Sequence, residues 1–185
     1  MRQLFLAIIL AGGPFASGAT AQDHPDFSGR WISEPAPVPS AREAAAAGTR
    51  AAPQVDRGSG WGRSIIIAQD ERTLTVVWPI FSPYDLQPPL RFVYALDGSE
   101  SVNTVMMGRG TQRQRSHAAW AGRSLVLTTV HTFTDPASGR PIESEVRQSL
   151  TLESPTSLVI ETVRGGALGG PSSTTRTVYT KGAGT

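Results

Sequence analysis

The sequence contains no cysteine, little charge and no long uninterrupted hydrophobic run. The absence of cysteine excludes disulfide bonds, a lipid-modified cysteine, cysteine metal ligands and a cysteine nucleophile. Charged residues make up 17% of the chain and the formal net charge is +2, which argues against nucleic acid as a partner. Together with 19 Gly and 14 Pro, this low charge disfavours helical bundles and coiled coils and indicates a chain with many turns.

Residues 1–21 have the pattern of a secretory signal peptide. Arg2 gives a basic start, an apolar run follows at 4–10, and small residues precede Gln22. Two glycines and a proline follow the run, which is shorter than the roughly 20 residues that a membrane span needs. We therefore predict cleavage before Gln22, export to the periplasm or the extracellular space, no stable membrane insertion, and a single mature domain over 22–185.

Runs of β-branched and aromatic residues dominate the chain from Arg63 onward. Short turn segments such as Asp97-Gly98 separate them. Short connections force neighbouring strands to be antiparallel, because parallel strands need long crossovers. We therefore predict an all-β fold, an antiparallel up-and-down β-barrel of about eight to ten strands, with a two-sheet sandwich as the alternative. The expected strands are 29–33, 65–67, 74–78, 90–96, 102–107, 111–120, 123–134, 142–152, 158–164 and 172–180.

Alternation in the longer strands assigns an inward face to each. We predict that Trp120, Leu125 and Ile142 lie on inward faces. In the last of these strands the opposite face carries two glutamates and an arginine, and burying them without partners is too costly in free energy. Under this assignment His117 points outward and His131 points into the lumen. The two histidines therefore do not converge, and we predict no metal site.

The segment 34–62, after the first expected strand, is rich in Pro, Ala and Gly and is predicted to be a long loop or lid. Within it, Ser40 and Glu43 have capping-box spacing, and the alanines at 44–47 favour a short helix. So short a helix forms only if it docks on the domain. A flexible linker is the alternative.

The motif Asp26-Phe27-Ser28-Gly29-Arg30-Trp31 precedes this long loop and the series of strands. The arrangement resembles the lipocalin and calycin-like barrels, and it is similar to the opening of secreted bacterial proteins of uncharacterised function with lipocalin-like domains. The resemblance implies structural roles for Gly29 and Trp31, which form its Gly-x-Trp motif, and for Arg176. Trp31 would plug one end of the barrel, and Arg176 in the last strand would pack across it.

An apolar lumen with a few neutral polar groups is typical of small-molecule sites. We predict that the protein binds a small apolar or amphipathic ligand there and that a Pro-rich aromatic segment at 79–86 helps to cover it. A lumen packed solid with side chains is the competing interpretation. The residues expected to supply contact area are Trp78, Tyr84, Met106 and Phe133, and those expected to orient the ligand are Gln114, His131 and Gln148.

Two other functions stay open. A barrel enzyme would use His131 as a general acid or base, because an imidazole pKa of about 6.5 suits proton transfer near neutrality. An envelope interaction module would bind another protein at a strand edge or at the rim and hold no ligand. No cofactor is predicted, because the glycine-rich segment 165–170 lacks the Lys-Ser/Thr of a phosphate loop. His24 is expected to be solvated near a frayed terminus.

Overall fold

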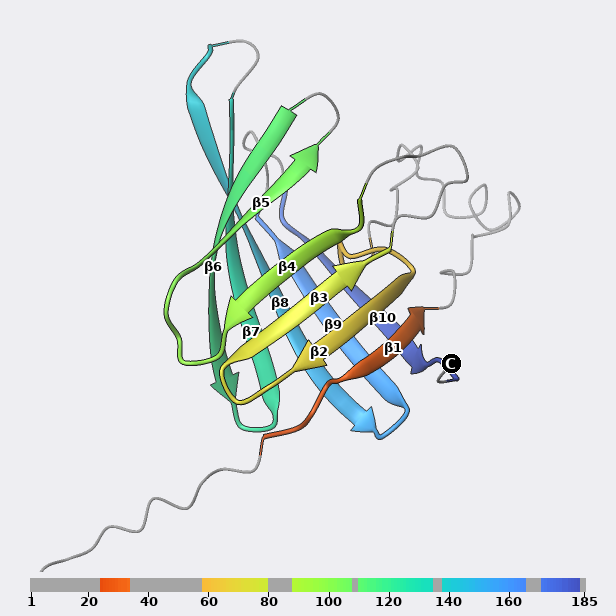
Figure 1. Ribbon diagram of the computed structural model, residues 1–185. Coiled ribbons are helices and arrows are strands. Elements are labelled where there is room, and N and C mark those ends of the chain that lie inside the picture. Colours follow the sequence, from red (N-terminus) through yellow and green to blue (C-terminus); the bar gives the residue numbers. More distant parts are fainter. Residues whose placement is uncertain are drawn as a thin grey trace, which may run out of the picture.

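The computed structural model describes residues 24–33, 58–79, 88–107, 110–134, 138–165 and 171–183. These residues form ten strands and contain no helix, which confirms the predicted all-β class (Figure 1). The predicted short helix at 40–47 lies outside the described residues. In the described part of the chain, no helix has the length and apolar character needed to cross a membrane.

All of the expected strands are present, and they follow one another in an up-and-down order. The sheet order is β4-β3-β2-β1-β10-β9-β8-β7-β6-β5, and each ladder is antiparallel. Because β1 pairs with β10, the sheet wraps into a nearly closed barrel (Figure 1). The strands are β1 Gly29–Ser33, β2 Ser64–Gln69, β3 Thr73–Trp78, β4 Leu90–Ala95, β5 Ser101–Met107, β6 Gly110–Ala121, β7 Ser124–Thr134, β8 Pro141–Ser154, β9 Ser157–Arg164 and β10 Ser173–Lys181.

The inward faces of the long strands are those predicted from alternation. Leu125 and Leu150 pair across β7 and β8 and are fully buried, whereas Glu143 and Arg147 on the opposite face of β8 are exposed. His117 is exposed and His131 is half-buried on the lumen face. Burial of the apolar residues on the inner face supplies the main driving force for this arrangement, since charges remain in water at no desolvation cost.

The two edge strands, β4 and β5, are joined by side chains in place of a backbone ladder. The Val93 N–H donates to Asn103 Oδ1 at 2.8 Å, and Asn103 Nδ2 donates to the Val93 carbonyl at 3.0 Å. One step away, the Ala95 N–H donates to Ser101 Oγ at 2.7 Å. A primary amide carries the same donor and acceptor as a peptide group, so Asn103 takes the place of a strand residue at this edge. We call this junction the β4–β5 seam.

Residues 24–28 close the lower end of the barrel, beneath which they run in Figure 1. Phe27 and Trp31 are fully buried, and Trp31 Nε1 donates to the Phe27 carbonyl at 2.8 Å. The His24 ring stacks on Trp120 with centroids 4.0 Å apart. The prediction that His24 is solvated is therefore wrong. Gln69 explains the docking, because its side chain accepts from the Phe27 N–H and donates to the Pro25 carbonyl, both at 3.0 Å.

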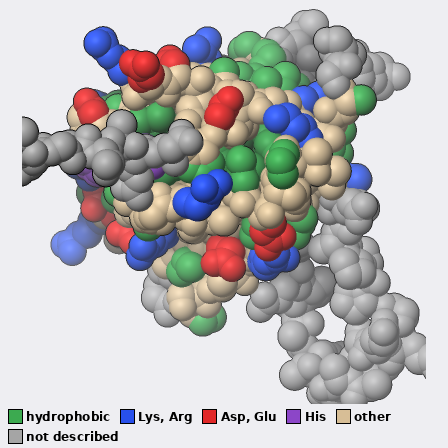
Figure 2. All heavy atoms as spheres, turned by 90° about the horizontal axis from the view of Figure 1, so that it is seen from below, with side chains coloured by type: hydrophobic (Ala, Val, Ile, Leu, Met, Phe, Trp, Pro, Cys, Tyr) green, Lys and Arg blue, Asp and Glu red, His purple; other side chains and the backbone are tan. Residues whose placement is uncertain are grey.

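Arg176 does not pack across Trp31 as the lipocalin resemblance implied. In β10 the buried residue is Tyr179, so alternation turns Arg176 outward, where it pairs with Glu153 at 2.6 Å. The cation over the Trp31 ring is Lys181, whose Nζ lies 5.3 Å from the ring centroid. Figure 2, a view from below, shows acidic and basic side chains interspersed around apolar ones at this end.

We predict that Gln69→Leu loosens the end closure. The substitution leaves the Phe27 N–H and the Pro25 carbonyl without their partner, so the free energy of unfolding falls by about 1–3 kcal/mol. Urea unfolding followed by tryptophan fluorescence measures the change. The control is Thr132→Leu, which alters an exposed side chain of β7 away from residues 24–28. Equal stability of the two variants would contradict the role given to Gln69.

Candidate ligand cavity in the barrel lumen

The lumen holds buried polar side chains as well as apolar ones. Gln114, Thr129 and Gln148 are each less than a tenth exposed. Buried polar groups destabilise a fold unless they are hydrogen-bonded. Ser116 and Thr129 satisfy each other across β6 and β7 at 2.9 Å. Gln148 finds its partner in a segment that is not part of the sheet.

Residues 58–62, which we call the inner strap, enter the barrel before β2 begins. Gln148 Nε2 donates to the Ser59 carbonyl at 2.6 Å, and Arg164 Nη2 donates to the Gly58 carbonyl at 2.6 Å. Trp61 follows and is 3% exposed. The inner strap therefore gives the polar wall its hydrogen-bond partners and places an indole inside the lumen.

A chain of hydrogen bonds runs through Tyr179 and fixes the inner strap. The Trp61 N–H donates to Ser59 Oγ at 3.2 Å, and Ser59 Oγ lies 2.6 Å from the Tyr179 hydroxyl. That hydroxyl donates to the Gly62 carbonyl at 2.6 Å. Burial raises the pKa of Tyr179 above its ordinary value, so the hydroxyl stays protonated and able to donate.

Glycine is required in the inner strap for two reasons. Gly60 and Gly62 have φ angles of 91° and 83°, in the left-handed region that residues with a Cβ atom rarely adopt. A Cβ at Gly62 would also collide with the Trp78 indole. Trp78 thus packs against the end of the inner strap, and a larger residue at position 62 would displace one or the other.

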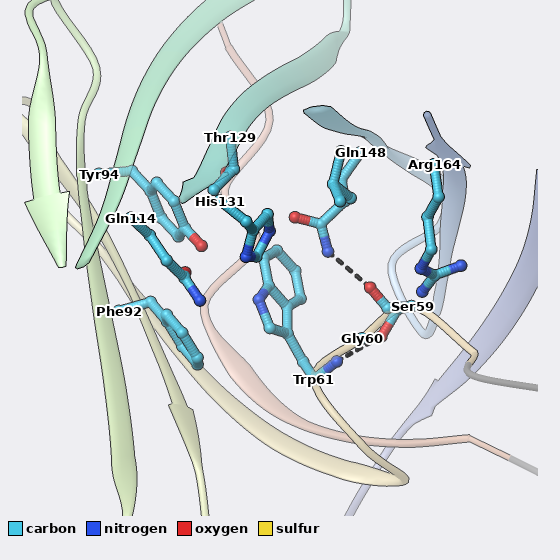
Figure 3. Close-up of a pocket in the computed structure, with 11 residues that line it drawn as sticks. Ser59, Gly60, Trp61, Phe92, Tyr94, Gln114, Thr129, His131, Gln148 and Arg164 are labelled. Atoms are coloured by element: carbon cyan, nitrogen blue, oxygen red, sulfur yellow. Dashed lines mark hydrogen bonds between the residues drawn. The ribbon is translucent and has the colours of Figure 1, made fainter. Parts of the chain in front are cut away.

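Next to the inner strap the lumen retains a cavity of about 120 Å³ that is partly open to solvent (Figure 3). Its aromatic wall consists of Trp61 from the inner strap and Phe92 and Tyr94 from β4. Its polar wall consists of Gln114, Thr129, His131, Gln148 and Arg164, from β6 to β9. An apolar cavity of about 150 Å³ in another protein holds benzene, so this space suits one small ring or a few waters. The lumen is therefore neither packed solid nor as wide as a typical drug-sized site.

Electrostatics in the cavity favour neutral side chains. Burial lowers the pKa of His131 below its ordinary value of 6.5, and the nearby Arg164 charge lowers it further. His131 is therefore neutral at pH 7, with one ring nitrogen that donates and one that accepts. Burial also raises the pKa of Tyr94, which keeps its hydroxyl protonated. Among the described residues, no three His, Asp or Glu side chains come together as metal ligands.

The structure brings together the three polar residues proposed from the sequence. Gln114, His131 and Gln148 line one wall of the cavity, on three neighbouring strands (Figure 3). Of the apolar residues proposed with them, the two whose side chains the structure describes do not join this wall. Trp78 abuts Gly62, and Phe133, two residues beyond His131 on β7, is half-buried and does not line the cavity. Tyr84 and the side chain of Met106 lie outside the described part of the chain.

Sequence reasoning missed the aromatic wall as a binding surface. Alternation places Phe92 and Tyr94 on one face of β4, so a signal for their inward position was present. Nothing local distinguishes Trp61 from the rest of the predicted loop 34–62. Its burial depends on partners far along the chain, such as Tyr179, which is 120 residues from Ser59.

We predict a pH dependence of stability that comes from His131. Because its pKa is lower in the folded chain than in the unfolded chain, the unfolded state binds more protons below pH 6.5. Its contribution to stability is complete above pH 6.5, falls as the pH drops toward the folded pKa, and is constant below it. NMR titration of the His131 ring measures the folded pKa directly, and urea unfolding of His131→Gln between pH 5 and 8 shows a smaller loss on acidification. A midpoint at or above 6.5 would refute the assignment.

The chain was compared with protein-family models, with curated proteins and with solved structures. None of these comparisons found a match for it. The lipocalin resemblance therefore stays a prediction from the sequence.

Proposed function

We propose that the protein reversibly binds one small amphipathic molecule of about the size of a single ring in the lumen cavity. One observation carries the proposal: a cavity of about 120 Å³ lies between an aromatic wall and a polar wall. The apolar part of the ligand would lie against Trp61 and Phe92. Its polar group would face Gln114 and His131. Small-molecule sites are commonly built in this way, with apolar area for affinity and a few polar groups for orientation.

Gln114 supports this orientation of the ligand. Its side chain is buried, yet the hydrogen bond that Gln114 Nε2 donates to Gln112 Oε1 is long, at 3.4 Å. A buried amide gains free energy from a shorter and better-aligned partner. Gln148, by contrast, already donates to the Ser59 carbonyl at 2.6 Å and serves to hold the inner strap. The two glutamines of the polar wall thus have different roles.

The N-terminal pattern supports binding outside the cytoplasm. We infer that residues 1–21 are a cleaved signal peptide and that the mature domain is a lipocalin-like protein of the periplasm or the extracellular space. Support comes from the motif around Trp31 and from the barrel, in which Trp31 is fully buried. A reversible carrier or scavenger of small molecules is the corresponding role.

We predict that phenol binds in this cavity and that Gln114→Leu weakens its binding by roughly 3- to 10-fold, the effect of one lost hydrogen bond. The same variant binds toluene at least as well as the unaltered protein does, because an apolar residue then faces an apolar ring. Chemical-shift titration of the purified domain gives both affinities, with the His131 and Trp61 ring signals as reporters.

The control is Thr132→Leu, whose exposed side chain on β7 does not line the cavity and which should leave both affinities unchanged. Perturbed signals that cluster away from Trp61 and His131 would contradict the proposed site. The absence of saturable binding for phenol and toluene alike would contradict the proposed function.

A further inference from the structure

Beside the cavity, two neighbouring strands of the barrel wall are not joined by a backbone ladder. The β4–β5 seam holds the two edge strands together through Asn103 and Ser101. Val93, which Asn103 binds, lies between Phe92 and Tyr94 of the aromatic wall. On the other side of the seam, Asn103 pairs in register with Gln114 of the polar wall. The seam therefore runs along the cavity and separates its two kinds of wall.

The side-chain link covers only part of the seam. The next residue of β5 on the inward face after Ser101 and Asn103 is Val105, whose buried side chain has no group that can form a hydrogen bond. In Figure 1, β4 and β5 diverge toward the upper end of β5. Outside, Val93 is 36% and Val102 is 44% exposed, so an apolar side chain flanks the seam on each strand.

Opening at the seam requires fewer broken hydrogen bonds than opening between the long strands β7 and β8. Three hydrogen bonds from two side chains join β4 to β5, whereas β7 and β8 are paired over ten residue positions. Proteins open locally where few such interactions must be broken, with free energies far below that of global unfolding. Parting of β4 from β5 would expose Phe92 on one side and Gln114 on the other without disturbing the buried lower end.

We propose that the β4–β5 seam is a lateral gate. Asn103 and Ser101 release the backbone of Val93 and Ala95, the two strands separate, and the ligand passes into the cavity between Phe92 and Gln114. The passage of a ligand rests on the proposed function, whereas the opening of the seam does not. The two parts are tested by separate measurements.

Amide hydrogen exchange in the ligand-free protein tests the opening. The amides of Val93 and Ala95 point into the seam, and those of Phe92 and Tyr94 point toward β3. We expect the amides of Val93 and Ala95 to exchange at least about tenfold faster than those of Phe92 and Tyr94, through local opening. Asn103→Leu should increase the exchange rate of the Val93 amide further. Ser101→Ala should accelerate the exchange of the Ala95 amide. Its matched control is Ser124→Ala, which removes a side-chain hydrogen bond between β7 and β8 and should leave the exchange rate of the Ala95 amide unchanged.

Exchange of Val93 only through global unfolding, at the rate of Leu125 in β7, would overturn the opening of the seam. The opening of the seam would also be overturned if Asn103→Leu slowed the exchange of the Val93 amide, or left it unchanged, while the protein stayed folded.

A crosslink across the seam tests the passage of ligand. The chain has no cysteine, so the double variant V93C/V102C presents two outward thiols that a short bis-maleimide can join. We expect the crosslink to slow phenol association and dissociation by about tenfold or more, as measured by NMR exchange, and to alter the dissociation constant by less than about threefold. The same double variant, capped with N-ethylmaleimide at each thiol, is the control.

Unchanged phenol rates in the crosslinked protein would refute the gate even if the seam opens. Failure of phenol to bind the unaltered protein would refute the proposed function, and the amide exchange result would then decide the opening alone.

Discussion

The burial of the inner strap is the constraint on which the arrangement of the lumen depends. Ser59 lies at its centre, with its carbonyl bound by Gln148 and its hydroxyl bound to Tyr179. These contacts satisfy polar groups that would otherwise be buried without partners, at a cost of about 1–3 kcal/mol each. They also hold Trp61 inside the barrel. The strap therefore determines both the stability of a polar lumen and the small size of the cavity.

The barrel closes in two chemically different ways. At β1 and β10 the closure is a backbone ladder in which Trp31 pairs with Lys181, next to the buried lower end. At β4 and β5 it is made by Asn103 and Ser101, next to the cavity. Backbone pairing thus joins the barrel where the core is packed, and side-chain links join it where the proposed ligand would enter.

Predictions from the sequence succeeded where a local pattern decides the outcome. Alternation placed Leu125 and His131 inside, because a strand residue on one face is followed by a residue on the other. They failed for Arg176 and His24. The position of Arg176 across Trp31 was assigned by analogy with a family, although alternation in β10 puts Arg176 on the face opposite the buried Tyr179. His24 was judged by its position near a terminus, although Gln69 provides docking partners for the residues that follow it.

The sequence by itself determined the strands, their antiparallel order and most inward faces, because turn residues and a period of two are properties of short segments. It also placed Gln114, His131 and Gln148 in the lumen as residues to orient a ligand. Only the tertiary structure decided that Trp61 fills part of the lumen, that Lys181 covers Trp31 and that side chains close the β4–β5 seam. Each of these depends on groups that chain folding brings together, which no local pattern encodes.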